Sequence, residues 1–277
     1  MTKNAKLRRA RMMPAIQAAE PPLKQPPSFE VLGVEIDGSG FQAVLDRVVH
    51  APETRERLAV HFLTVHSLVT AQDDAAVRGA FGQGLTEPDG MPLVWLGRRK
   101  GFQVERVCGP DFMPALIAAG LVGGRSHYFY GGLPGVPEAL ARRFSTLYPR
   151  LRVVGTFSPP FREMSAEEDD AVVNQINAVQ PDYVWVGLGA PKQDLWVASH
   201  RARLNAPVLL AVGAAFDFHG GRRRRAPRWM QKSGTEWLYR LASEPRRLAG
   251  RYVTINLRFA GLLLRGWLSR RFALGRR

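Results

Sequence analysis

The strongest constraint on the fold of this chain is a set of short hydrophobic runs without polar interruption. Two of them are YVWVGLG at 183–189 and PVLLAVGAAF at 207–216. Neither run alternates apolar and polar residues, as a strand with one face in water would. Uninterrupted runs are typical of parallel strands that are covered on both faces. The segments expected as strands are 29–36, 58–65, 126–130, 151–156, 182–188 and 207–215.

Amphipathic stretches typical of helices lie between these runs. Residues 136–147 follow the Gly-rich turn GGLPG, and residues 192–204 follow GLGAP. The stretch 165–179 opens with Ser165 and Glu168, the spacing of a capping box. Strands alternating with helices predict an α/β fold, a Rossmann-like parallel sheet with helices on both faces.

The positive charge of the chain is concentrated at its two ends. Residues 222–277 hold sixteen Lys or Arg against two acids, and residues 1–27 hold six against one. The whole chain carries +15, so the span 28–221 carries about −4. We therefore expect a flexible, basic, Pro-rich arm at 1–27, an α/β domain at 28–221 and an Arg-rich helical appendage at 222–277.

The appendage is expected to be a basic loop followed by one or two helices, broken near Pro245. Arg251, Arg258 and Arg265 recur every seven residues and share one helix face. Apolar side chains occupy the other faces: Ile255, Leu262, Leu263 and Trp267. This basic amphipathic pattern favours a helix lying on an anionic membrane surface. The alternatives are a helix packed on the domain with its Arg face in water, or an apolar face buried in a homo-oligomer.

Several protein classes are disfavoured by composition. The single cysteine, Cys108, cannot form an internal disulfide, and residues 1–27 lack the apolar stretch of a signal peptide. No run reaches the ~18 apolar residues that span a bilayer. We therefore expect a cytoplasmic protein, peripheral on the inner face of the plasma membrane.

Ligands of an open parallel sheet bind beyond the carboxyl ends of its strands, so the candidate site residues follow the apolar runs. Thr64 and His66 follow one run, and Asp89 lies in a PDG turn. Asp89 is either the cap of a helix starting at Met91 or a carboxylate able to take a proton from a hydroxyl nucleophile. Arg106 is either a phosphate ligand or a member of a surface ion pair.

Two further turns suit anionic ligands. Gly131 and Gly132 form a Gly-rich turn before a helix, a cradle suited to phosphate oxygens. Lys192 and Gln193 begin the helix after GLGAP, and Gln193 can make a two-pronged hydrogen bond to a sugar or base. Asp217 follows the last run. The sequence has no GxGxxG, P-loop, GxSxG, HExxH or CxxC motif, and no metal or cofactor is predicted.

In their order along the chain, several motifs resemble the WecG/TagA/CpsF glycosyltransferases (glycosyltransferase family 26) from about 29 to 252. The motifs are TVH, PDGMP, ERVCGPD, YFYGG, GLGAPKQD, VGAAFDFHGG, RAPRW and TEWLYRLASEPRRLAGRY. The resemblance implies a metal-independent, inverting transferase. It would move a hexose or N-acetylhexosamine-type sugar from a UDP-sugar to a saccharide on a polyprenyl diphosphate, in cell-surface or exopolysaccharide biosynthesis.

The resemblance also implies roles for particular residues. It places the catalytic base on Asp89 and substrate contacts on Thr64, Arg106 and Gln193. Further substrate contacts are expected from His66, Gly131, Gly132, Lys192, Asp217 and, in the appendage, Arg225 and Arg228. The chain departs from the family in having His66 where Asn is usual and Asp194 where Glu is usual, so the donor sugar stays open.

Two other functions compete with this interpretation. A pI near 10.9 and the run 222–225 invite a nucleic-acid-binding protein, but the tail alternates Arg with Leu, Ile, Phe and Trp, and no nucleic-acid partner is predicted. The other alternative is a scaffold of the same fold without catalytic activity, for which His66 is the only argument.

Overall fold

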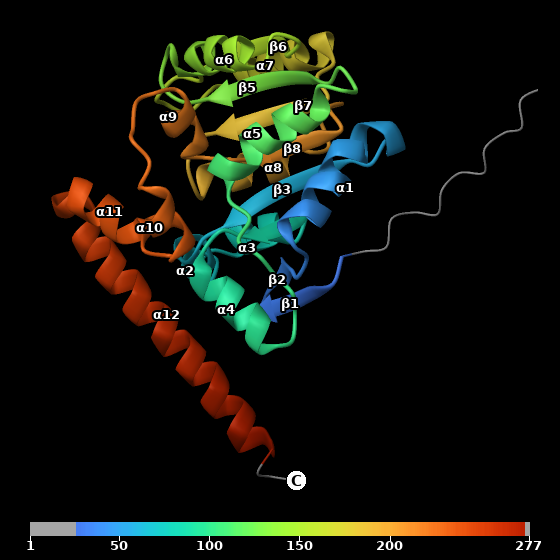
Figure 1. Cartoon of the computed structure of the whole chain (residues 1–277). Coiled ribbons are helices and arrows are strands. Elements are labelled where there is room, and N and C mark those ends of the chain that lie inside the picture. Colours follow the sequence, from blue (N-terminus) through green and yellow to red (C-terminus); the bar gives the residue numbers. More distant parts are fainter. Residues whose placement is uncertain (1–25, 275–277) are drawn as a thin grey trace, which may run out of the picture.

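The computed structural model describes residues 26–274, except for the side chains of Lys232, Arg247, Arg251 and 269–274. The predicted arm at 1–27 lies, apart from its last two residues, outside the described residues. At the centre of the molecule is a six-stranded sheet with the order β4-β3-β8-β7-β5-β6, in which every pairing is parallel (Figure 1). The predicted α/β class with a parallel sheet is confirmed. The strands are β3 (Leu58–Leu63), β4 (Leu85–Pro88), β5 (Ser126–Gly131), β6 (Arg152–Phe157), β7 (Tyr183–Gly187) and β8 (Val208–Ala211).

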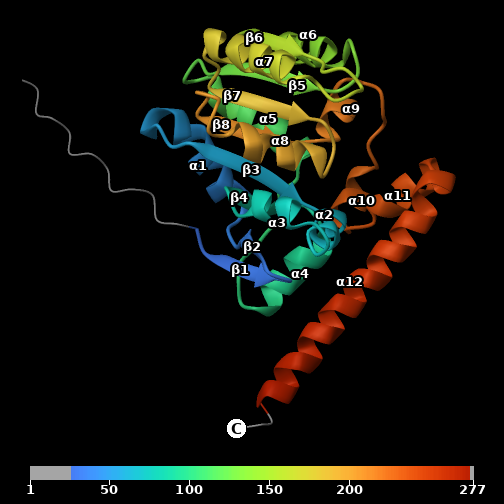
Figure 2. The same ribbon diagram turned by 180° about the vertical axis from the view of Figure 1, so that it is seen from behind.

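Helices cover both faces of this sheet, as Figure 1 and the reverse view in Figure 2 show. The face visible in Figure 1 carries α1 (Phe41–Thr54), α5 (Gly109–Gly120), α6 (Val136–Leu147) and α9 (Ala215–His219). The opposite face carries α7 (Ala166–Val179) and α8 (Lys192–His200), with α3 (Ala75–Phe81) packed beside α8. Helices α2 (Val65–Thr70) and α4 (Met91–Arg99) follow β3 and β4. The predicted capping box of α7 forms: Ser165 accepts from the Glu168 backbone, and the Glu168 carboxylate accepts from the Ser165 backbone.

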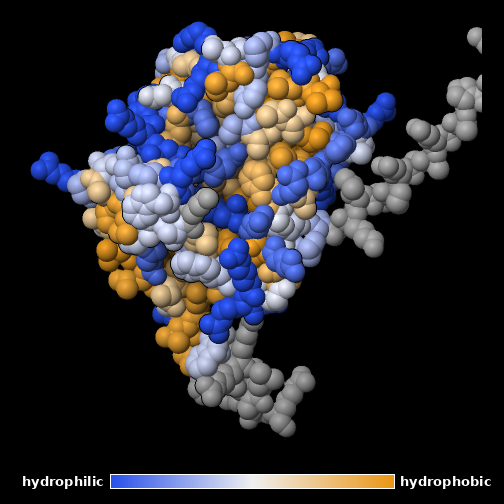
Figure 3. Space-filling model, in the orientation of Figure 1, coloured by the Kyte–Doolittle hydropathy of each residue, from blue (hydrophilic) through white to orange (hydrophobic). Residues whose placement is uncertain are grey.

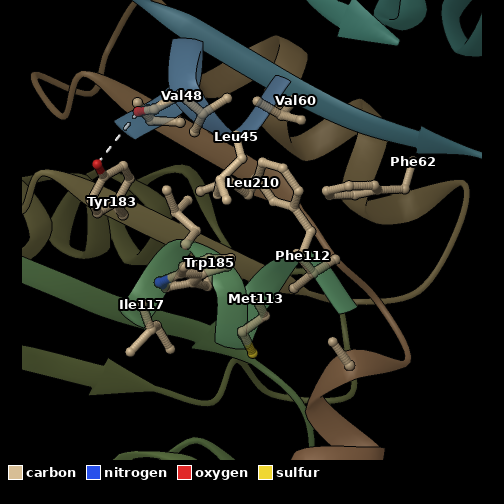
Figure 4. Close-up of a cluster of buried hydrophobic side chains, with 14 of the residues drawn as sticks. Leu45, Val48, Val60, Phe62, Phe112, Met113, Ile117, Tyr183, Trp185 and Leu210 are labelled. Atoms are coloured by element: carbon tan, nitrogen blue, oxygen red, sulfur yellow. Dashed lines mark hydrogen bonds between the residues drawn. The ribbon is translucent and has the colours of Figure 1, made fainter. Parts of the chain in front are cut away.

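The core explains why the strands read as continuous hydrophobic runs. Along β7, Tyr183 and Trp185 face α1 and α5, whereas Val184 and Val186 face α7 and α8. Since alternate residues point to opposite faces, a strand covered on both sides needs apolar residues at every position. Figure 4 shows the hydrophobic cluster on the face covered by α1 and α5, in which the Tyr183 hydroxyl donates to the Val48 carbonyl at 3.4 Å.

Two strand predictions need correction. The segment 29–36 is a hairpin of β1 (Ser28–Val31) and β2 (Val34–Asp37), because Leu32 and Gly33 both adopt positive φ and turn the chain. The edge strand β4 was not among the predicted strands. Its sequence is Leu-Thr-Glu-Pro, and all four residues are nevertheless buried.

The part of the appendage that the structure describes, residues 222–274, has three helices: α10 (Arg228–Lys232), α11 (Glu236–Ser243) and α12 (Pro245–Leu274). The predicted break near Pro245 is confirmed. Helix α12 is a long rod whose middle part packs against α2 and whose C-terminal part extends past the body (Figures 1 and 2).

One face of α12 packs on the domain. Phe259 is buried, and Ile255, Leu262 and Leu263 pack on a cluster built from the β1–β2 hairpin and helices α2, α3 and α4. The expectation that Ile255, Leu262 and Leu263 face a membrane is therefore wrong, because they are covered by the chain itself. Arg258, beside this face, pairs with Asp73.

A second apolar face of α12 stays exposed. It is formed by Val253, Leu257, Leu264, Trp267 and Leu268, whose exposed fractions run from 38% to 69%. The first four of these positions lie on one side of a helix, opposite Phe259. In Figure 3, hydrophobic (orange) and hydrophilic (blue) residues lie side by side along this edge of the molecule. No helix in the described part of the chain has the length and apolarity to cross a membrane.

The two faces of α12 predict different responses to truncation. Replacing buried Phe259 with Ala should lower the free energy of unfolding by about 3 kcal/mol, because it removes a ring and leaves a cavity. Leu257→Ala, on the exposed face, should change it by less than about 0.5 kcal/mol. Denaturant unfolding of both variants checks this, and equal effects would contradict the packing described here.

Candidate functional site

Asp89 follows the carboxyl end of β4, at the rim of the sheet. Its backbone N–H donates to the Leu63 carbonyl at 3.0 Å, which places it beside the end of β3. The helix-cap interpretation of Asp89 is wrong, because the N-cap of α4 is Gly90 and no side chain caps that helix. The Asp89 side chain keeps 20% of its surface exposed, so it can be reached from solvent at the rim of the sheet.

The main partner of Asp89 is Arg106. Its Nη2 donates to Asp89 Oδ1 at 2.8 Å, and its Nε donates to the Asp89 backbone carbonyl at 2.5 Å. Burial raises the pKa of Asp89 above its ordinary value, and the charge of Arg106 only partly reverses that shift. Burial acts to lower the pKa of Arg106, but Asp89 and the neighbouring acids raise it above its ordinary value. Of the two interpretations of Arg106, the structure shows the ion pair, in a half-buried rather than a surface setting.

A second carboxylate reaches Arg106 from the appendage. Glu236, the first residue of α11, accepts from Arg106 Nη1 at 3.1 Å, and its other oxygen lies 3.6 Å from Arg225 Nε. Arg225 in turn makes two bonds to Asp111. The five side chains form an ionic ladder of alternating sign, Asp89–Arg106–Glu236–Arg225–Asp111, which joins the sheet rim to the appendage.

The ladder also sets the ionisation of its neighbours. Burial opposes the charge of Asp111, but the paired Arg225 outweighs it and lowers the Asp111 pKa. Cys108, buried beside the ladder, donates its thiol to Asp111 at 3.0 Å. Burial and the charge of Asp89 raise the pKa of Cys108 well above its usual value, so this thiol stays protonated.

A pocket of about 340 Å³ adjoins the ladder. Its wall includes the acids Glu236 and Glu244, the basic side chains Arg223, Arg224 and Arg240, and the rings of Phe218 and Tyr239. Arg223 pairs with Glu244 at 3.0 Å. Arg240 lies over the Phe218 ring at 5.3 Å from its centroid. Asp89 is not part of this wall; it is linked to the pocket through Arg106 and Glu236. Cationic and aromatic groups around one cavity suit an anionic ligand with an aromatic or apolar part.

Two other predicted site residues, Thr64 and His66, lie near Asp89, and the Thr64 hydroxyl is already used in a hydrogen bond within the protein. Thr64 is the N-cap of α2, and its hydroxyl accepts from the Ser67 backbone at 3.1 Å. His66 lies half-buried in the first turn of α2. Because the end of β3 pairs with the end of β4, the structure brings both to the same part of the rim as Asp89.

The Gly-rich turn after β5 has a packing role. A Cβ on Gly131 would lie 2.7 Å from the backbone of Gly187, and Gly131 has a φ of +121°. The N–H of Gly132 donates to the Gly187 carbonyl at 2.9 Å. The glycines therefore let the ends of β5 and β7 meet, and the Gly132 amide is already used within the protein.

The turn after β7 is likewise closed by its own bonds. Gln193 is buried; its Nε2 donates to the Ala211 carbonyl at 2.7 Å, and its Oε1 accepts from the Gly189 backbone at 3.1 Å. The two-pronged bond expected from Gln193 is thus made to the protein's own backbone. Lys192 is exposed at the start of α8. The strand that precedes these residues, β7, is separated from β4 by β3 and β8.

The last two candidates lie near the basic loop. The Asp217 carboxylate pairs with Arg223 at 3.5 Å and Arg222 at 3.9 Å, which ties α9 to the loop. Arg228 is exposed at the start of α10. Of the basic candidates, Arg225 is in the ladder, whereas Lys192 and Arg228 stay in solvent. In the described part of the chain, no three His, Cys, Asp or Glu side chains are grouped so that they could hold a metal ion.

Two acidic residues of this region, Glu236 and Glu87, were not among the predicted site residues. Glu236 could have been noticed as one of only two acids in 222–277. Glu87, two residues before Asp89 on β4, is fully buried, and both its carboxylate oxygens lack a donor partner among the described residues. It lies within hydrogen-bonding reach of Asp37, and burial together with the charge of Asp37 raises the pKa of Glu87 well above its usual value. Burial therefore favours the protonated form of Glu87.

Comparison with known proteins identifies a matching family and, among the similar sequences, a curated relative. The sequence model described as "Glycosyl transferase WecG/TagA/CpsF family" matches residues 29–273. A curated relative from Bacillus subtilis (strain 168) is named N-acetylglucosaminyldiphosphoundecaprenol N-acetyl-beta-D-mannosaminyltransferase. It is 28% identical over 161 residues, which make up 58% of this chain and 61% of the relative. The match thus spans less than two thirds of that protein.

The proton held by Glu87 predicts a pH-dependent stability. The pKa of Glu87 is higher in the folded state than in the unfolded state. Its contribution to the free energy of unfolding is therefore complete below the unfolded pKa. That contribution is lost as pH rises towards the folded pKa, at about 1.4 kcal/mol per pH unit. Glu87→Gln cannot ionise and can still donate to Asp37. Between pH 5 and pH 8 the variant should therefore gain at least about 1 kcal/mol relative to the native chain. Denaturant unfolding at both pH values measures this, with exposed Glu30→Gln as control; a constant difference would contradict the buried proton.

Proposed function

Since this chain belongs to the WecG/TagA/CpsF family of glycosyltransferases, we propose that it is an inverting, metal-independent transferase that uses a UDP-sugar. The acceptor is a saccharide on a polyprenyl diphosphate, in cell-surface or exopolysaccharide biosynthesis. The name of the Bacillus subtilis relative supports an N-acetylglucosaminyl-diphosphate lipid as acceptor and an N-acetylmannosaminyl donor as the first to test. The observation that carries the proposal is a partly exposed Asp89 of raised pKa at the sheet rim, joined by ion pairs to a pocket of basic and aromatic side chains.

In this scheme Asp89 is the general base. As the acceptor hydroxyl oxygen forms a bond to the anomeric carbon, its proton passes to the Asp89 carboxylate and the bond from that carbon to the UDP oxygen breaks. A single displacement of this kind inverts the anomeric centre. Burial raises the pKa of Asp89, which makes it a stronger base than an exposed aspartate.

The departing UDP carries the electron pair of the broken bond and needs cations near its diphosphate. Arg223, Arg224 and Arg240 line the pocket beside the ladder and supply them. Phe218 and Tyr239 in the same wall offer faces for the base or sugar. Fixed charges that are already in place act without reorganisation as negative charge develops.

The appendage also suits a lipid-linked acceptor. Leu257, Leu264 and Trp267 expose apolar surface on α12, and Arg265 lies on the same helix. Cations near an anionic leaflet contribute about 1 kcal/mol each, and apolar side chains add to this when they enter the interface. We propose that the exposed face of α12 lies on the cytoplasmic face of the membrane, where the acceptor is anchored.

Asp89→Asn tests the catalytic role. The amide keeps the shape of the side chain but cannot take the proton, so turnover should fall by about 10²–10⁴-fold. Affinity for UDP, measured by calorimetry, should stay within about threefold. The donor panel is UDP-N-acetylmannosamine, its uronic acid and UDP-glucose, with an N-acetylglucosaminyl-diphosphate lipid as acceptor. Unchanged turnover would refute the base, and lost UDP binding would make Asp89 a donor ligand instead.

Membrane contact by α12 is tested on the exposed face alone. The double variant Leu257→Ser/Leu264→Ser should bind anionic phosphatidylglycerol vesicles at least about tenfold more weakly, because it removes apolar surface that enters the interface. Val122→Ser is the matched control, since Val122 is 92% exposed on the body, far along the chain from α12. Co-sedimentation is the measurement, and equal binding by the native chain and the double variant would contradict this orientation.

A further inference from the structure

We infer that Glu236 is a positioning residue for the reaction: it holds Arg106 in place and offsets its charge, so that Asp89 is a competent base only when the appendage is docked. This inference rests on the proposed function, because it assumes that Asp89 takes the proton. It assigns to an acid in the basic appendage a role in the chemistry of the sheet rim.

The contacts of Glu236 are those of a built site. Its side chain is 12% exposed, and its Oε2 accepts from Arg106 Nη1 at 3.1 Å while its Oε1 faces Arg225 Nε at 3.6 Å. Arg106 keeps its Nε and Nη2 for Asp89. One guanidinium is thus divided between a base on the body and an acid on α11, and its orientation is fixed from both sides.

The charge of Glu236 also acts on the pKa of Asp89. A guanidinium paired with Asp89 alone would stabilise the carboxylate and weaken it as a base. Burial is the largest influence on the pKa of Asp89 and raises it. Among the charged neighbours, Arg106 and Arg240 favour the charged form of Asp89, and Glu236 disfavours it. Cys108 beside them is a neutral thiol. Glu236 is therefore the acid that counteracts the two arginines.

This arrangement links two regions of the chain that are far apart in the sequence. Arg106 and Glu236 are 130 residues apart, and the contact exists only when α11 lies against the body. An appendage that is displaced would take its carboxylate with it and leave Asp89 paired with an unshared Arg106. Docking of the appendage and the basicity of Asp89 are then parts of one equilibrium.

Glu236→Gln tests the inference, because it removes the charge and keeps the shape. In pH profiles of kcat/KM, the acid limb should move to lower pH by roughly half a unit to one unit, since Asp89 loses the neighbour that raises its pKa. At neutral pH kcat should fall about three- to tenfold, and the KM for the UDP-sugar should stay within about twofold. Glu236→Asp, which keeps the charge, should restore at least half of both losses.

The control is Asp73→Asn. It also removes an ion pair between body and appendage, the exposed Asp73–Arg258 pair, but neither of these residues acts on the pKa of Asp89. Its pH profile should match that of the native chain. The inference is overturned if Glu236→Gln keeps the native acid limb, if Asp73→Asn shifts it equally, or if Glu236→Gln loses its fold in thermal unfolding while Asp73→Asn does not.

The two proposals fail in distinguishable ways. If Asp89→Asn stays active, the proposed base is wrong and the role of Glu236 falls with it. If Asp89→Asn is inactive and Glu236→Gln behaves as the native chain, only the inference about Glu236 is wrong.

Discussion

The division of Arg106 between Asp89 and Glu236 is the interaction on which the site and the placement of the appendage both depend. A half-buried guanidinium is costly without acceptors, and a half-buried carboxylate is costly without donors. Each member of the ladder therefore requires the next. The same logic gives meaning to the uneven charge of the sequence. Arginines of the appendage form ion pairs with Asp111, Asp217 and Asp73 of the body, so part of the excess positive charge holds the appendage in place.

Beneath the ladder, the sheet supplies a rim whose shape is fixed by backbone contacts. Gly131 permits the close approach of β5 and β7, and buried Gln193 joins the turn after β7 to the end of β8. These features hold the strand ends, whereas the ionic groups are supplied by the loops and the appendage. A rigid platform preserves the geometry of the site, while the charged groups of the loops and appendage offset the cost of their burial by pairing with one another.

The fold class could be predicted from the sequence because a doubly covered strand leaves a continuous apolar run. Strand β4 escaped that pattern because Glu87 is buried in it. Burial raises the pKa of Glu87 and favours its neutral form, which no local sequence pattern reveals. The hairpin at Leu32 was missed because a leucine at positive φ is rare. Asp89 could be predicted as a candidate but not separated from a helix cap until Gly90 was seen to be the N-cap. Glu236 could not be placed at all, because its partner is 130 residues away.

Helix α12 shows why a sequence pattern alone did not settle the function of the appendage. It has two apolar faces, and periodicity does not tell which one the body covers. Packing of Phe259 against the body leaves Leu257 and Leu264 facing outwards, so the choice of face is made by tertiary contacts. Because α12 begins two residues after α11 ends, the orientation of its exposed face also constrains the orientation of Glu236. A membrane bound by that face would therefore fix the orientation of α11 relative to the body. That orientation sets the contact between Glu236 and Arg106, and through Arg106 it would affect the basicity of Asp89.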